Sequence, residues 1–316
     1  MKIILSRKGV DSFSGGISSI ISEAGRMRSI PIPARWDKSI PVAPRDTLRY
    51  KDLPYEGKSL GLTIEKLISS RKARKERMRQ GDPCHLDPDL SKANLRTRAR
   101  GWLPMFGQVD KAASHLLNEG VREGDLFLFF GWFRRSQDRA GRLRFDPNDR
   151  GTHVIFGWLQ IGEIWCQSRP KPAIPGWARY HPHVRGSVAN LYNSASPINV
   201  VFIAKQRLEI PGIRSRLLGG GVFSTFHEDL CLTEPNRSRS HWRLPSWMYP
   251  FPNRKPLTYH EKGWRWRKRG RRALLKTVGR GQEFILDLDS SGDKYSEKYP
   301  VEKVQKWLGK IFAHAR

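Results

Sequence analysis

The sequence contains histidines and carboxylates that could move a proton. His181 and His183 are separated by one proline, and Asp87 and Asp89 are separated by another. An imidazole titrates near neutral pH and a carboxylate can orient it, so an Asp and a His could act as general base and general acid. The Asp pair could equally serve as turn and helix-cap residues. Two histidines without a defined third ligand are a weak metal motif, so the sequence favours hydrogen-bonded or anion-contacting histidines and predicts no metal site.

Tryptophans and arginines are interleaved near the C-terminus, where residues 264–272 read WRWRKRGRR. Arginine binds phosphate through paired hydrogen bonds and tryptophan stacks on bases, so this pattern favours nucleic-acid binding. A second basic run covers residues 71–79, and a solvated charged surface is the alternative for both runs. The nucleic-acid-binding residues expected from the two runs are Lys72, Arg74, Lys75, Trp264, Arg265, Trp266, Arg267, Arg269, Arg271 and Arg272.

Composition agrees with a polyanionic partner. The 316 residues carry 58 Lys and Arg against 30 Asp and Glu, a formal net charge of +28, and their 11 Trp, 14 Phe and 8 Tyr are too many for a disordered basic tail. Nucleic acid is therefore the expected partner, with DNA favoured over RNA. No membrane partner is expected, because the longest apolar run, residues 126–133, is much shorter than the roughly 20 residues of a span.

The N-terminus and the cysteines bear on the compartment. Residues 1–5 are too short an apolar stretch for a secretory signal, so a cytoplasmic location is expected. Cys84, Cys166 and Cys231 are odd in number and widely spaced, which predicts neither a disulfide nor a cysteine zinc site. Neither a cofactor nor an oligomeric state can be assigned from these patterns.

Hydrophobic periodicity predicts an α+β fold. Strands are expected at residues 1–5, 126–133, 153–165 and 198–204, with the second and third as neighbours in a sheet. Helices are expected at residues 63–79, 108–119 and 301–312, the last an amphipathic helix that begins after Pro300.

Residues 121–165 resemble the core of PUA-like domains, including the EVE and ASCH families. The resemblance lies in a Gly124-Asp125 turn before one strand and the pattern from Gly157 to Glu163 in the next. It implies a mixed sheet forming a partly closed β-barrel with peripheral helices, whose cleft receives a nucleobase. Trp132 could then stack on the base and Arg134 could hold a phosphate or a base edge, whereas the alternative is that the aromatic residues fill the barrel core.

A wider resemblance rests on several blocks in a fixed order. These blocks are residues 2–9 with Asp11 and Gly15-Gly16, then residues 85–90, 107–108, 114–116, 124–134, 181–183 and 242–245. Together they resemble the third family of nucleotide modification associated domains. The resemblance implies one domain over residues 1–260, with the PUA-like core at about 121–235. Residues 261–316 would then be a basic Trp- and Arg-rich extension that carries the amphipathic helix.

Members of that family are bacterial and phage proteins proposed to act in DNA base modification, which implies a protein that binds nucleic acid and handles a nucleobase. The alternatives are a non-catalytic reader of modified or structured DNA or RNA, and an enzyme acting on free nucleotides. The polar residues of the shared blocks form the candidate site. Its catalytic residues would be Asp11, Asp87 and His181, and its substrate-binding residues Arg7, Gln108, Trp132, Arg134 and His183. Six of these are expected on one concave surface, namely Arg7, Asp11, Asp87, Gln108, Arg134 and His181.

Overall fold

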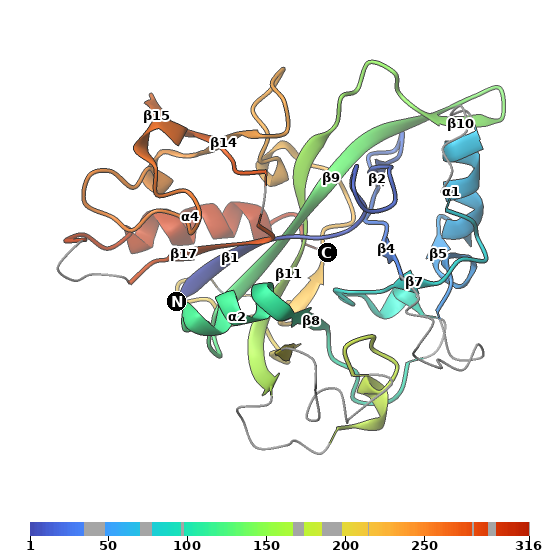
Figure 1. Ribbon diagram of the computed structural model, residues 1–316, viewed down its shortest axis with the longest axis horizontal. Coiled ribbons are helices and arrows are strands. Elements are labelled where there is room, and N and C mark those ends of the chain that lie inside the picture. Colours follow the sequence, from blue (N-terminus) through green and yellow to red (C-terminus); the bar gives the residue numbers. More distant parts are fainter. Residues whose placement is uncertain are drawn as a thin grey trace.

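The fold is known from a computed structural model, and it is α+β (Figure 1). The structure describes residues 1–34, 48–69, 78–95, 98–166, 174–184, 198–213, 215–279, 281–289 and 295–315. In these ranges a strongly curled mixed sheet is flanked by the helices α1 (Leu60–Ser69), α2 (Asp110–Asn118) and α4 (Val301–Phe312). None of the helices described is long and apolar enough to cross a membrane.

The main sheet is built around two long strands, β9 (Leu126–Arg139) and β11 (Thr152–Cys166). Its path runs β17 (Glu283–Asp287), β1 (Lys2–Arg7), β9, β11, β12 (Asn199–Ala204) and β8 (Met105–Val109). Strand β1 is parallel to β9, and the other neighbours on this path are antiparallel. The long strands cross the middle of Figure 1, and the register of β11 shifts at two points, which bends a strand and increases its twist.

Shorter strands complete the architecture. The main sheet also holds β2 (Ser19–Ile21), β3 (Met27–Arg28), β10 (Arg142–Phe145) and β13 (Gly220–Val222). A separate three-stranded sheet contains β14 (His241–Pro245), β16 (Arg272–Lys276) and β15 (Trp266–Arg269). Two small pairs are β4 (Ile32–Pro33) with β7 (Cys84–His85), and β5 (Pro54–Tyr55) with β6 (Lys58–Ser59).

The apolar run at the start of β9 is buried on both faces of the sheet, which explains why it does not alternate with polar residues. On one face the rings of Phe127 and Phe129 each lie 5.1 Å from that of Phe106. On the other face Phe130 packs against Trp242, with 5.0 Å between ring centroids. The aromatic residues of this region therefore form the core of the domain.

The expected elements are largely confirmed. Strands β1, β9, β11 and β12 lie where hydrophobicity predicts them, and β9 pairs with β11 as expected. Helix α2 matches its expected range to within two residues, and α4 matches at both ends. The helix expected at 63–79 begins earlier, at Leu60, and is described only to Ser69.

The C-terminal segment shares its packing with the rest of the chain. Strand β17 pairs with β1 in the main sheet, and α4 buries Val304, Leu308 and Ile311 in the same hydrophobic core. The boundary expected at residue 260 therefore crosses a shared core.

Candidate functional site

Four polar side chains from two distant segments meet in one place. His85 and Asp87 lie at β7 and just after it, and His181 and His183 follow the short 3-10 helix η4 (Gly176–Ala178). His181 Nε2 lies 3.3 Å from Asp87 Oδ1. The Nε2 atoms of His183 and His85 lie 3.6 and 4.0 Å from Asp87 Oδ2. These four residues are called the Asp87–His cluster below.

Strand β8 holds the carboxylate of Asp87 in place. The backbone N–H of Gly107 donates a hydrogen bond of 2.8 Å to Asp87 Oδ1. A Cβ at position 107 would lie 2.1 Å from Cγ of His183, so only glycine lets the strand approach both residues this closely. One carboxylate oxygen is therefore anchored, and Oδ2 faces His85 and His183.

Asn199 fixes the tautomer of His183. Its Nδ2 donates to the backbone carbonyl of His183 at 3.0 Å, which directs its Oδ1 to His183 Nδ1 at 3.1 Å. The amide oxygen only accepts, so Nδ1 of His183 carries the proton. Its Nε2 is the ring nitrogen that faces His85, whose Nε2 lies 3.3 Å away.

His181 lies behind the carboxylate. Its side chain is fully buried, and its Nδ1 accepts the backbone N–H of His183 at 3.4 Å. Nε2 therefore carries the proton and faces Asp87 Oδ1, but it makes no well-aligned hydrogen bond with any residue that the structure describes. His181 is placed to orient Asp87.

A second network ties the two segments together through Asp89. Arg98 binds both carboxylate oxygens of Asp89, at 2.7 and 2.8 Å. The hydroxyl of Tyr180 donates to Asp89 Oδ2, and Asn94 donates to Oδ1 at 3.0 Å. Because Tyr180 is adjacent to His181, this buried ion pair sets the position of one half of the cluster relative to the other.

Burial and close charges fix the protonation of the cluster. Burial lowers the pKa of His85 to about 4, although the charge of Asp87 opposes this. Burial alone would raise the pKa of Asp87, but His183 and His181 hold it well below its usual range. At neutral pH an ionised carboxylate thus faces a neutral imidazole. Asp87 is too acidic to be an effective general base, and it suits orienting a histidine or binding a cation.

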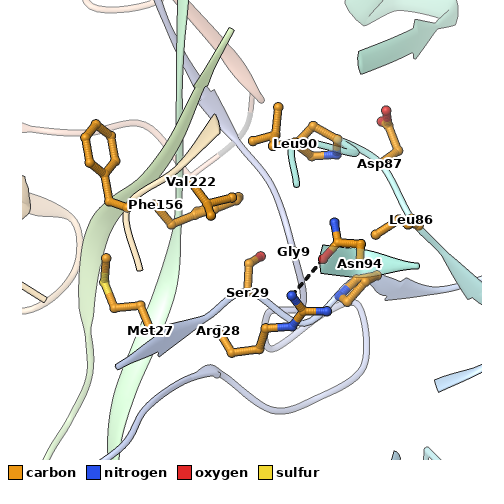
Figure 2. Close-up of a pocket in the computed structure, with 13 residues that line it drawn as sticks. Gly9, Met27, Arg28, Ser29, Leu86, Asp87, Leu90, Asn94, Phe156 and Val222 are labelled. Carbon is orange, nitrogen blue, oxygen red and sulfur yellow. Dashed lines mark hydrogen bonds between the residues drawn. The ribbon is translucent and has the colours of Figure 1, made fainter. Parts of the chain in front are cut away.

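Asp87 also lines a small cavity of about 60 Å³ (Figure 2). Arg28 also lines this cavity, and its Nη1 donates to Asn94 Oδ1 at 2.7 Å. Nε and Nη2 of Arg28 are buried without a hydrogen-bond partner among the described residues. Burial lowers the pKa of Arg28 to about 10, so its charge remains at neutral pH. The cavity offers positive charge to a small group, and it is smaller than the roughly 300 Å³ of ordinary ligand pockets.

Three expected site residues line a different cavity. Arg7 and Asp11 lie with Trp132 in a cavity of about 270 Å³. The guanidinium of Arg239 covers the Trp132 ring, 4.0 Å from its centroid. Asp11 Oδ1 accepts the N–H groups of residues 13 and 14, which is the pattern of a turn residue.

Two further expected residues line neither cavity. Gln108 donates to Glu283 Oε1 at 2.6 Å, and Glu283 also pairs with Lys8. Arg134 donates to the backbone carbonyls of Asp146 and Asp149, so it holds the loop between β10 and β11. The structure therefore brings Asp87, His181 and His183 together and places Arg7, Asp11, Trp132, Gln108 and Arg134 elsewhere.

The β15–β16 hairpin carries five of the ten residues expected to bind nucleic acid. Arg267, Arg269, Arg271 and Arg272 are exposed on it. Trp264 is 61% exposed and lies under the guanidinium of Arg265, whose carbon is 4.4 Å from the ring centroid.

Trp266 is placed differently. It is buried, and its Nε1 donates to the carbonyl of His260, so it is a core residue that cannot stack on a base. Lys72, Arg74 and Lys75 lie outside the described residues.

Sequence reasoning missed a basic groove beside that hairpin, and it also left His85 out of the site. The groove, of about 280 Å³, is lined by Arg243, Arg271, Arg272, Lys303, Lys306 and Lys310, and the acidic Glu228 and Asp229 line it as well. The three lysines follow one another by three and four positions, which puts them on one face of α4. That spacing was the signal in the sequence.

Comparison with known proteins assigns the family. A family model described as nucleotide modification associated domain 3 matches residues 2–287, which include the whole Asp87–His cluster. A search of curated proteins gives no significant match, and a search of solved structures gives none either. Because the family model covers most of the chain, the protein belongs to the nucleotide modification associated domain 3 family.

Proposed function

We propose that the protein is an enzyme that modifies a nucleobase in nucleic acid, with the Asp87–His cluster as its reacting centre. The observation that carries this proposal is the convergence of His85, Asp87, His181 and His183 from segments about 100 residues apart. A purely structural role would not need a buried carboxylate surrounded by three imidazoles. Perturbed titratable groups held in fixed orientation are typical of functional sites.

The neutral imidazole of His85 is the group that meets the substrate. Its side chain is 28% exposed, whereas the side chains of Asp87, His181 and His183 are at most 8% exposed. The cavity that Asp87 lines is too small for a whole base, so a flipped base would lie outside it, against the exposed part of His85. Burial keeps the imidazole of His85 neutral, so it meets the base as an uncharged group, and the ionised carboxylate of Asp87 behind it orients it.

The basic groove and the β15–β16 hairpin support nucleic acid over a free nucleotide. Phosphates are bound by clustered Lys and Arg with release of counterions, and the groove supplies six such side chains. In Figure 1, β15 and β7 lie on opposite sides of the long strand β9. A polynucleotide is the substrate class that can use both regions at once, since a mononucleotide reaches only one of them. We also propose that the curled main sheet is a PUA-like β-barrel.

One observation favours a second function, a non-catalytic reader of a modified base. The cavity beside Arg7 and Asp11 has about 270 Å³ and offers an aromatic ring, Trp132, already stacked by Arg239. His153 lines it, and burial lowers the pKa of His153 to about 3, so this imidazole stays neutral and suits recognition by hydrogen bonds. A reader would use this cavity and would not need the Asp87–His cluster.

The test is mass spectrometry of nucleosides from DNA of cells that lack the gene, carry it, or carry Asp87→Asn. An enzyme predicts a nucleoside that appears with the wild-type gene and is lost both without the gene and with Asp87→Asn. A reader predicts identical nucleosides in all three strains, together with base-specific binding that Trp132→Ala removes. Identical nucleosides in all strains and no such binding would contradict both functions.

A further inference from the structure

We propose that His85, Asp87 and His183 form a binding site for one divalent first-row transition-metal ion. The potential ligand atoms are Nε2 of His85, Oδ2 of Asp87 and Nε2 of His183, and they lie within 4.8 Å of one another. This site does not depend on the proposed reaction, because metal binding can be measured on its own.

The separations between these atoms suit a shared ion. The two Nε2 atoms are 3.3 Å apart. Two nitrogens at Zn–N distances of about 2.0–2.1 Å in tetrahedral geometry are roughly 3.3–3.4 Å apart. Asp87 Oδ2 lies 3.6 and 4.0 Å from the two nitrogens, so it needs to move inward by only a few tenths of an ångström.

Two of the ligands are already oriented for a metal. Asn199 accepts a hydrogen bond from Nδ1 of His183, so Nε2 is the ring nitrogen that points into the site. Gly107 holds Asp87 through Oδ1, which leaves Oδ2 for a single bond to the ion. Ligating histidines and carboxylates typically have such outer hydrogen bonds, which set their tautomer and direction.

His181 provides an independent observation. Its fully buried Nε2 lacks a well-aligned hydrogen bond to the described residues and lies 3.3 Å from Asp87 Oδ1. A buried N–H without a hydrogen bond lowers the stability of the fold, so the position of this N–H in His181 needs an explanation. A bound metal ion provides this explanation. When Oδ2 of Asp87 moves toward the ion, the carboxylate can rotate so that it accepts the hydrogen bond from His181.

The donor set selects the class of metal. Two imidazoles and one carboxylate suit Zn²⁺, Fe²⁺, Mn²⁺, Co²⁺ or Ni²⁺, whereas Mg²⁺ and Ca²⁺ prefer oxygen ligands alone. Three protein ligands leave at least one coordination position for water or substrate, as in catalytic sites rather than closed structural ones. That position faces outward beside His85, whose side chain is the most exposed of the three.

The chain offers a matched control in a second cluster, His227, Asp229 and His314. Its side chains are between 24 and 50% exposed, and the two imidazole rings stack at 3.7 Å. Nδ1 of His227 accepts the backbone N–H of Asp229, so its lone pair is already used. Ions held there would be bound weakly, as at any exposed His-Asp surface.

The experiment uses the full chain, stripped with a chelator and then titrated separately with Zn²⁺, Co²⁺, Mn²⁺ and, without oxygen, Fe²⁺. Bound metal is counted by elemental mass spectrometry, and affinity is measured by competition with a chromophoric chelator. The variants are His85→Ala, Asp87→Asn, His183→Ala and the control His227→Ala, each checked by circular dichroism. The affinities measured in this way rank the four ions for the three donors.

We expect one tightly bound ion in the wild type and in His227→Ala. Loss of an outer-sphere partner weakens metal sites by about 10–100-fold, so loss of a direct ligand should weaken binding by at least about 100-fold. If a ligand variant does not fold, the spectrum of wild-type Co²⁺ protein decides, because imidazole nitrogen and carboxylate oxygen ligands are expected. The proposal is overturned if the wild type binds no ion more tightly than about 1 mM, or if His183→Ala and Asp87→Asn bind as the wild type does. Either result leaves the proposed reaction open to its own test.

Discussion

Gly107→Ala should disable the Asp87–His cluster without removing any of its polar groups. The added Cβ would lie 2.1 Å from Cγ and 2.3 Å from Cδ2 of His183. Ordinary contacts begin at 3.4 Å, so the imidazole must move by at least about 1.3 Å. A misplacement of about 1 Å can cost a reaction about 100-fold. We therefore expect the yield of modified nucleoside, or the metal affinity, to fall by about 100-fold.

The fold should survive this change, because overpacking of one methyl group typically costs about 1–3 kcal/mol. Gly107 does not have a positive φ, so alanine adds no backbone strain. Gly176→Ala is the control, since a Cβ at 176 meets no atom within 4 Å and the residue lies in the neighbouring η4. Full activity and full metal affinity in a folded Gly107→Ala protein would refute the assigned position of His183.

Three other perturbations follow from the structure. Asp89→Asn breaks its buried bidentate pair with Arg98, and urea unfolding should show a loss of about 3–5 kcal/mol. Burial lowers the pKa of His260 to about 4 in the folded protein, whereas in the unfolded chain it is about 6.5. The neutral imidazole therefore contributes stability that is complete above pH 6.5 and is lost as the pH falls toward 4. Between these values the wild type should lose up to about 1.4 kcal/mol per pH unit relative to a folded His260→Gln variant. Arg271→Glu should weaken DNA binding and reduce the log–log salt slope by about 0.9 per lost phosphate contact, whereas Arg142→Glu on the distant β10 strand should not.

Each of these has a contrary result. An unfolding free energy within about 1 kcal/mol of wild type in Asp89→Asn would mean that the pair with Arg98 is not essential. If the free energy of unfolding depends on pH equally in wild type and His260→Gln, the imidazole of His260 is protonated in the folded protein with an ordinary pKa. Equal losses of DNA binding in Arg271→Glu and Arg142→Glu would point to net charge rather than to the groove.

The sequence predicts those elements whose patterns are local. The run at 126–133 and the stretch 153–165 are apolar enough to specify neighbouring strands, and the spacing of residues 301–312 specifies α4. The pairing of β17 with β1 is different, since it joins residues 277 to 285 positions apart. Hydrophobic periodicity carries no information about which distant strand supplies the edge of a sheet.

In the candidate site, too, the sequence reveals local features but not long-range contacts. Asp87, His181 and His183 could be predicted as chemically competent residues, and the structure brings them together. His85 could not be singled out, because a histidine in a two-residue strand has no local feature that marks it as part of a site. Trp266 is the exception in the Trp-Arg run, because it packs into the hydrophobic core and its Nε1 donates to the carbonyl of His260, contacts that the local sequence does not reveal.

The central claim is that the Asp87–His cluster is the reacting centre of the protein. Its most direct test measures modified nucleoside in DNA from cells that express, at equal protein level, wild type, His85→Ala, Asp87→Asn, His183→Ala or the surface control His227→Ala. We expect the nucleoside at full yield with wild type and His227→Ala, and at background with the three cluster variants. Wild-type yield from a folded Asp87→Asn protein would contradict it.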